Sequence, residues 1–161
     1  MLVLGIGNSL LQDEGIGIHL LKYMETFFPA FPELVYLDGG TLSFTLAGDI
    51  ESHDHLLVLD AVELHARPGT LCCYEDGAMD HFLGTTKRSA HEVGLLDLLD
   101  IARLTGHFPR HRALVGIQYA RFAWGEALTP EVNDSIPLAG RLAANVLQKW
   151  RVEQNATRSA L

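Results

Sequence analysis

Cationic residues are scarce in this sequence and do not cluster. Its 161 residues include 12 Lys and Arg against 20 Asp and Glu, which gives a formal net charge of −8. A surface of this sign repels phosphate backbones, and no run of Lys or Arg offsets it. We therefore do not expect nucleic acid as a partner.

Long apolar runs and cysteines are also few. No stretch approaches the ~20 apolar residues that a membrane-spanning helix needs. The first residues lack a cationic region and meet Gly5 and Gly7 almost at once, which favours a buried strand over a signal peptide. The two cysteines, Cys72 and Cys73, are neighbours. In a strand they would point to opposite faces, where a mutual disulfide is geometrically poor. We expect a cytoplasmic protein with no membrane partner.

Short apolar runs alternate with segments of helical period. No linker, repeat or low-complexity segment interrupts them, so we expect a single domain over residues 1–153 and a frayed polar tail over 154–161. The alternation predicts a mainly parallel sheet with helices on both faces. The expected strands are 2–6, 33–37, 55–59, 70–74 and 113–117. The expected helices are 16–28, 44–50, 92–104 and 130–150, the last kinked or split at Pro137. Phe27 is expected on the apolar face of the first helix, and Phe44 is expected to point inward from the second. Residues 75–88 are expected to be loop with a possible helical turn.

Three carboxylates stand at or just beyond expected strand ends. Glu14 follows the first strand after a Gly/Asn/Ser loop, while Asp38 and Asp60 close the second and third. The carboxyl ends of parallel strands share one edge, where ligands bind, so these side chains could meet in one cleft. Carboxylates held together raise one another's pKa or demand a cation, which makes the group a candidate metal or acid/base site. The alternatives are that Asp38 only bonds turn amides and that Asp60 is a buried structural residue.

The stretch from Gly5 to Gly17 also allows a nucleotide interpretation. A strand, a glycine-rich loop and a helix are typical of a dinucleotide site. That pattern needs a third glycine where Leu10 stands, and Asp13 and Glu14 at the helix start would repel a phosphate. The competing interpretation is that Asp13 caps the helix and Glu14 is solvated.

One of the eight histidines lies in the first turn of an expected helix. His91 follows Ser89, which with Glu92 makes a capping-box pattern. Spacing alone does not select this histidine. A set of one Glu, one Asp and one His suits a borderline divalent ion such as nickel or zinc, and three protein ligands leave a position open for water or substrate.

Together these stretches resemble the nickel-iron hydrogenase maturation endopeptidases. The opening Gly-x-Gly-Asn-x-Leu-x-x-Asp-Glu-Gly-x-Gly of that family is matched throughout from Gly5 to Gly17. Three later stretches look like its further motifs: Asp38-Gly39-Gly40-Thr41, Leu59-Asp60-Ala61 and His91-Glu92-Val93-Gly94-Leu95. One departure is Tyr119-Ala120, where the family often has proline followed by an acidic residue.

The resemblance implies a three-layer α/β/α sandwich with a twisted five-stranded sheet. It implies an endopeptidase, aspartic-type or metal-assisted, that removes the carboxy-terminal extension of a hydrogenase large-subunit precursor after nickel insertion. Nickel would come with the precursor, and no organic cofactor is implied. Metal contacts carry over to Glu14, Asp60 and His91, and a catalytic role carries over to Asp38. A non-catalytic nickel chaperone or, less favoured, a nucleotide-binding module stays an alternative, and no oligomeric state is implied.

Overall fold

The computed structural model describes residues 1–28, 31–85 and 90–159, without the side chains of 90–93 and 158–159. The described residues form a five-stranded sheet in the order β2-β1-β3-β5-β4. Strands β1, β2, β3 and β5 run parallel, and β4 lies antiparallel to β5 at one edge. The strands are β1 (Leu2–Gly5), β2 (Val35–Asp38), β3 (His55–Val62), β4 (Leu71–Glu75) and β5 (His111–Gln118). The mainly parallel sheet is confirmed.

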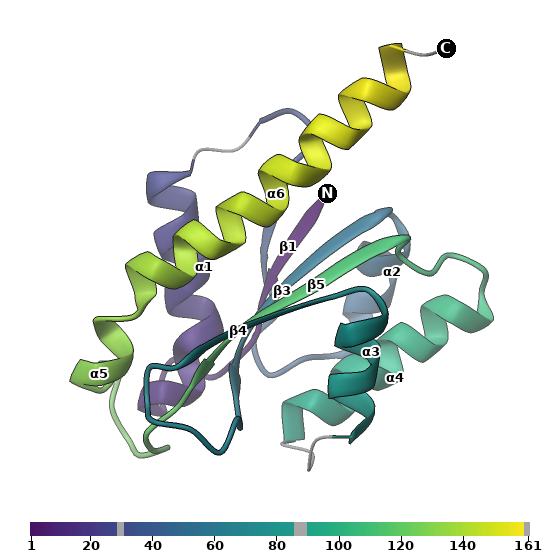
Figure 1. Cartoon of the computed structure of the whole chain (residues 1–161). Coiled ribbons are helices and arrows are strands. Elements are labelled where there is room, and N and C mark those ends of the chain that lie inside the picture. Colours follow the sequence, from purple (N-terminus) through teal and green to yellow (C-terminus); the bar gives the residue numbers. More distant parts are fainter. Residues whose placement is uncertain (29–30, 86–89, 160–161) are drawn as a thin grey trace.

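Helices cover both faces of the sheet (Figure 1). One face carries α1 (Ile16–Phe27), α5 (Pro130–Asn133) and α6 (Ile136–Ser159), and the other carries α2 (Ala47–Glu51), α3 (Gly77–Thr85) and α4 (Ala90–Leu104). Two 3-10 turns, η1 (Gln12–Gly15) and η2 (Phe44–Leu46), precede α1 and α2. The expected three layers are therefore confirmed. No helix in the described ranges is both long and apolar enough to cross a bilayer.

Alternation along the strands builds two separate cores. Leu57 and Leu59 pack with α1 and α6, whereas the intervening Val58 packs with α2 and α4 on the other face. The neighbouring cysteines divide in the same way: Cys73 lies against the first core and Cys72 against the second. Both thiols are free, as the strand geometry predicts.

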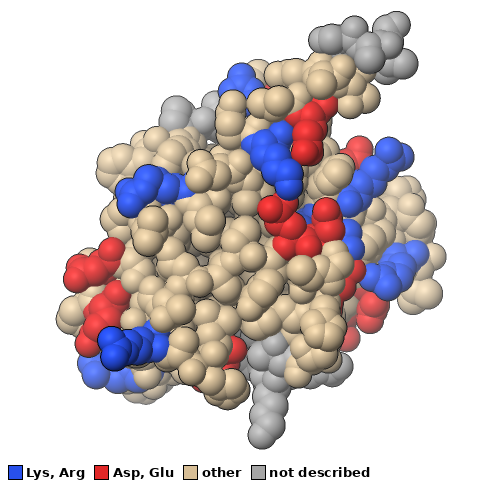
Figure 2. Space-filling model, in the orientation of Figure 1, with Lys and Arg blue, Asp and Glu red and all other residues tan. Residues whose placement is uncertain are grey.

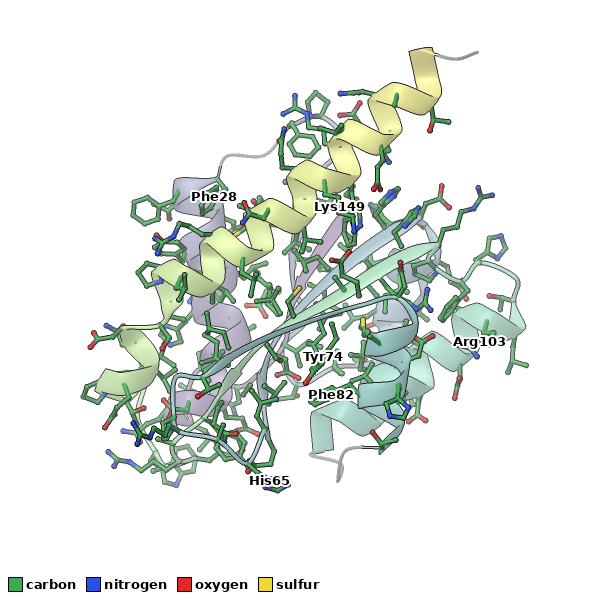
Figure 3. The ribbon with its side chains drawn as sticks, in the orientation of Figure 1. Phe28, His65, Tyr74, Phe82, Arg103 and Lys149 are labelled. Carbon is green, nitrogen blue, oxygen red and sulfur yellow. The ribbon has the colours of Figure 1, made fainter. Side chains whose placement is uncertain are left out.

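The antiparallel edge strand β4 is held by contacts from both layers (Figure 3). Tyr74 of β4 stacks on Phe82 of α3 with ring centroids 4.5 Å apart. On the other side, Lys149 of α6 reaches Glu75, with 2.8 Å between Nζ and Oε2. On the face of the molecule that Figure 2 shows, charged side chains lie mainly around the margins, and the middle is largely uncharged.

Several expectations from the sequence were wrong. Residues 77–85, expected as loop with a possible helical turn, form the 9-residue helix α3, because Met79 and Leu83 are buried and Phe82 stacks on Tyr74. Phe44, expected to point inward, is 70% exposed. Phe27 is 61% exposed, although the spacing placed it on the buried face of α1.

Two boundaries also differ, and one expected break is present. Strand β3 continues to Val62, so Asp60 lies inside the strand and not at its end. Helix α6 runs to Ser159, so most of the expected frayed tail is helical. The split at Pro137 is confirmed, because α5 ends at Asn133 and α6 starts at Ile136.

Candidate active site

The loop that follows β1 connects the carboxyl ends of its two neighbours. Ile6 donates its backbone N–H to the carbonyl of Leu59 in β3, at 2.9 Å. Gly7 donates to the carbonyl of Gly40, at 2.8 Å, in the turn that follows β2. The segments that carry the three candidate carboxylates are thus bound to one another through their backbones. In Figure 1 this edge of the sheet faces the lower left.

Two glycines of the opening motif allow this close approach. A Cβ atom at Gly7 would lie 2.0 Å from the carbonyl oxygen of Glu14, and the φ of Gly7 is +140°. A Cβ atom at Gly17 would lie 2.2 Å from the carbonyl oxygens of both Ile6 and Leu59. The chain therefore uses these glycines to pack against itself. This packing argues against the nucleotide interpretation, in which the same glycines admit a pyrophosphate.

Glu14 lies in η1, which packs against β3. Its backbone N–H donates to Leu11 and its carbonyl accepts from Asn8, both at 3.2 Å. The residue is half-buried, and its Oε2 atom is fully covered. The backbone bonds therefore hold the main chain of Glu14 against the loop that follows β1.

Asp38 ends β2 and is exposed. Its Oδ1 accepts a hydrogen bond from the N–H of Gly40 at 2.9 Å. The expected turn bond is therefore present. A carboxylate that is exposed and oriented by its own turn can still hold a water molecule or take a proton.

Asp60 is almost fully buried, with 3% exposure. Its Oδ1 accepts from the N–H of Ala61 at 2.7 Å, and its backbone stands opposite Gly116 of β5. Because strand side chains alternate, Asp60 shares the face of Val58 and Val62, which α4 helps to cover. Helix α4, whose first turn includes the backbone of His91, therefore packs on the face of the sheet that carries Asp60.

The start of α4 lies beside the turn that follows Asp38. A Cβ atom at Gly94 would lie 3.3 Å from Cδ1 of Leu42, and Leu42 donates its N–H to Gly39. The two segments border a groove of about 460 Å³ that is lined by Thr41, Leu42, Ser43, Phe44, Gly94, Asp97 and Leu98. The groove opens next to the candidate site.

The backbone of His91 belongs to the first turn of α4, but its side chain lies outside the described residues. Ser89 and the side chain of Glu92, the expected capping box, lie outside them as well. Among the side chains that are described, no three His, Cys, Asp or Glu residues form a metal cluster. The predicted ligand set of Glu14, Asp60 and His91 thus stays a prediction.

The sequence did not reveal the role of Asp13. Its carboxylate is fully buried and accepts from the N–H groups of Ala120, at 2.9 Å, and Arg121, at 3.3 Å. It also accepts from the N–H and the hydroxyl of Thr129, both at 2.8 Å. Asp13 binds the segment that follows β5, which is a different role from the helix cap expected from the sequence.

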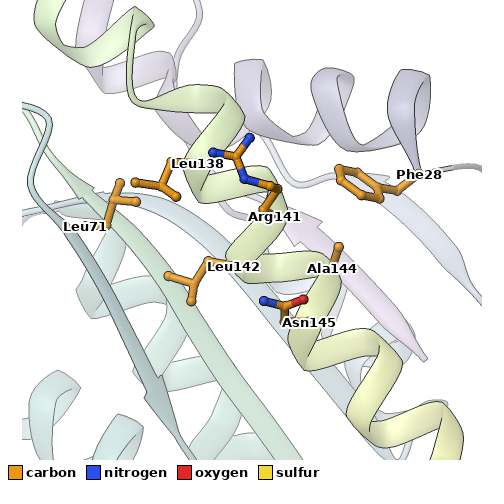
Figure 4. Close-up of a pocket in the computed structure, with 7 residues that line it drawn as sticks. All are labelled: Phe28, Leu71, Leu138, Arg141, Leu142, Ala144 and Asn145. Carbon is orange, nitrogen blue, oxygen red and sulfur yellow. The ribbon is translucent and has the colours of Figure 1, made fainter.

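A reactive type of side chain and a surface pocket lie away from this edge of the sheet. Burial raises the pKa of the Cys72 thiol to about 12. The apolar pocket between α6, β4 and the end of α1 is lined by Phe28, Leu71, Leu138, Arg141, Leu142, Ala144 and Asn145 (Figure 4). Among the described residues, no acidic side chain lines this pocket, which gives them no carboxylate chemistry there.

Comparison with known proteins identifies the family of the chain. The family model HycI, hydrogenase maturation protease, matches residues 18–146. The hydrogenase 2 maturation protease of Escherichia coli (strain K12) is 38% identical over 156 residues, which cover 95% of this chain and 93% of that protein. The hydrogenase expression/formation protein HupD of Rhizobium leguminosarum bv. viciae is 36% identical over 157 residues, which cover 97% of this chain and 78% of that protein.

A solved structure, the hydrogenase maturating endopeptidase HybD from E. coli, superposes with a TM-score of 0.86 at 36% identity. The match covers 92% of this chain and 91% of that one. The family match spans most of the chain, and the similarity extends to fold and sequence alike. The chain therefore belongs to the hydrogenase maturation protease family.

Proposed function

We propose that this protein is an endopeptidase that removes the carboxy-terminal extension of a nickel-iron hydrogenase large-subunit precursor after nickel insertion. The nickel belongs to the precursor and acts as the recognition element. The observation that carries the proposal is the backbone connection between the segments of Glu14, Asp38 and Asp60 at one edge of the sheet. Family membership supports the peptidase class.

In this proposal Glu14, Asp60 and His91 contact the nickel that the precursor carries. Two carboxylates and an imidazole suit a borderline divalent ion and leave room for groups of the precursor. The ion would polarise the scissile carbonyl as a Lewis acid. These residues thereby detect whether the precursor carries nickel, because cleavage requires the ion to be in place.

Asp38 is the proposed general base or water-positioning group. Its bond from Gly40 leaves the carboxylate at the surface, where water and the scissile bond can reach it. A general base must lie within hydrogen-bond reach of the proton that it takes. The bond from Gly40 supports this role, because it orients the carboxylate through its own turn.

The cytoplasm is the proposed location. Cys72 and Cys73 are free, as is usual in a reducing compartment. The precursor would have to be processed in that same compartment.

The test compares nickel-loaded and nickel-free precursor, each incubated with the protein and analysed by intact mass. A shortened product only with nickel supports the proposal. Metal transfer without shortening would favour a nickel chaperone. Cleavage of both forms at equal rates would overturn the role of nickel as the recognition element.

A further inference from the structure

The segment that follows β5, residues 119–129, folds back over the first loop of the protein. Gly125 forms a parallel bridge with Leu11, through an N–H bond to Leu10 at 3.0 Å and a carbonyl that accepts from Gln12 at 2.7 Å. Arg121 donates from Nε to the side-chain oxygen of Gln12, at 3.2 Å. The segment thus lies along the residues that immediately precede Glu14.

Asp13 is the buried anchor of this arrangement. It binds Ala120 and Arg121 near one end of the segment and Thr129 at the other. The donors satisfy a carboxylate that has no exposure to water. One side chain therefore fixes both ends of the segment to the turn that carries Glu14.

The segment is exposed and carries two large aromatic side chains at its surface. Trp124 is 83% exposed and Phe122 is 45% exposed, and Leu10, whose carbonyl accepts from Gly125, is 51% exposed. The ring of Phe122 lies against that of Tyr119, with centroids 4.4 Å apart, and Tyr119 donates its hydroxyl to Glu63 at 2.9 Å. Exposed aromatic side chains on a fixed backbone are typical of residues that dominate binding to a polypeptide partner.

We infer that Asp13 is a positioning residue, which holds the 119–129 segment as a preformed wall beside Glu14 for the precursor polypeptide to bind. The inference rests on the proposed function. Asp13 itself does not touch the substrate. It acts through Phe122 and Trp124, whose backbone it fixes before binding, so that the precursor does not have to order the segment.

The test uses Asp13→Asn in the full-length protein. The asparagine keeps the size of the side chain, but its amide replaces one acceptor oxygen by a donor, which opposes the donors of the segment. Asp100→Asn, on the exposed side of α4, is the matched control. Thr129→Ser keeps the hydroxyl and is the conservative variant.

The readouts are amide hydrogen exchange at Ala120 and Arg121 in the free protein, and kcat and KM with nickel-loaded precursor. We expect exchange to accelerate about tenfold or more in Asp13→Asn, because its one oxygen is uncharged and cannot accept from both ends of the segment as the carboxylate does. We expect KM to rise about tenfold, because binding must now order the segment, with kcat within about twofold of wild type. The control and Thr129→Ser should match wild type in all three quantities.

Three outcomes for Asp13→Asn would each overturn the inference. The first is faster exchange with an unchanged KM, and the second is a lower kcat at constant KM. The third is an exchange rate equal to that of wild type. If Asp13→Asn does not fold, Phe122→Ala combined with Trp124→Ala replaces it, since both side chains are exposed, and again KM alone should rise. If the wild-type protein does not cleave the precursor, the proposed function fails separately. Calorimetric titration with the same precursor then decides the inference. We expect the precursor to bind Asp13→Asn more weakly than wild type. Equal binding to the two proteins, or binding to neither, would contradict the inference.

Discussion

The carboxylate of Asp13 accepts hydrogen bonds from both the backbone N–H and the hydroxyl of Thr129, each at 2.8 Å. Thr129 stands directly before α5, where its side chain would ordinarily cap the helix. It makes no such cap bond, since its hydroxyl is directed to Asp13. A helix start near the end of the chain is therefore held by the glycine-rich turn near its beginning.

Loss of that hydroxyl should destabilise the protein measurably. Thr129→Val keeps the shape of a side chain that is only 3% exposed but removes the bond to a charged acceptor. We expect the free energy of unfolding in urea to fall by about 1.5–3 kcal/mol. Thr129→Ser retains the donor and should lose less. A loss for Thr129→Val below about 0.5 kcal/mol would show that the carboxylate is satisfied by its N–H donors alone.

A methyl group at Gly17 should be far more damaging than one at Gly48. The new Cβ at Gly17 would meet two carbonyl oxygens at 2.2 Å, whereas nothing lies within 4 Å of the position at Gly48. We expect Gly17→Ala to destabilise by more than about 3 kcal/mol. Gly48→Ala, within α2, should stabilise by about 0.5–1 kcal/mol. Thermal unfolding of both variants gives the comparison, and similar melting temperatures would contradict the packing at Gly17.

His55 should make the protein less stable in acid. Burial lowers the pKa of His55, and its neighbour His111, stacked at 4.8 Å between centroids, lowers it further together with the amino terminus. Asp54 and Glu153 oppose the shift but do not cancel it. The folded state therefore favours the neutral ring.

Below the ordinary pKa of 6.5 the unfolded chain binds the proton first, so stability is complete above pH 6.5 and falls as the pH drops toward the folded pKa. His55→Phe should flatten this fall, which urea unfolding between about pH 5 and 7 would measure. Part of the fall should remain, because burial also lowers the pKa of His19. An identical pH profile in wild type and His55→Phe would contradict the assignment.

Thiol reagents should not stop processing. Burial raises the pKa of Cys72 to about 12 and also raises that of Cys73, so neither forms a thiolate at neutral pH. Iodoacetamide should leave both thiols of the folded protein unmodified and should not slow cleavage of the nickel-loaded precursor. A serine-directed reagent should not slow cleavage either. Intact mass measured beside activity checks this. If cleavage activity were lost in proportion to the modification of one cysteine in the folded protein, a thiol would be the nucleophile.

Local patterns predicted most of the fold because each strand or helix carries its own period. The sheet, the helix after Gly15 and the split at Pro137 follow from residues close together in sequence. The extent of helix α3 was missed because it is held by distant segments: Phe82 stacks on Tyr74 of β4, and Asp80 pairs with Arg112 of β5. Phe44 has the hydrophobicity of a core residue, but it borders a groove at the surface.

Part of the candidate site could also be predicted from the sequence, and part could not. The backbone connections of Glu14, Asp38 and Asp60 agree with the edge predicted from strand ends, although Asp60 lies inside β3. The family assignment is confirmed. Asp13 could not be paired with Thr129 from the sequence, because their contact joins positions 116 residues apart.

The most direct test of the proposed reading of nickel is cleavage of nickel-loaded precursor by Glu14→Gln, Asp60→Asn and His91→Ala, followed by intact mass. Circular dichroism first establishes that each variant is folded, and Asp100→Asn serves as the control. The account predicts full shortening by wild type and control, and a rate at least about a hundredfold lower in each of the three variants. Normal shortening by a folded His91→Ala variant would contradict it.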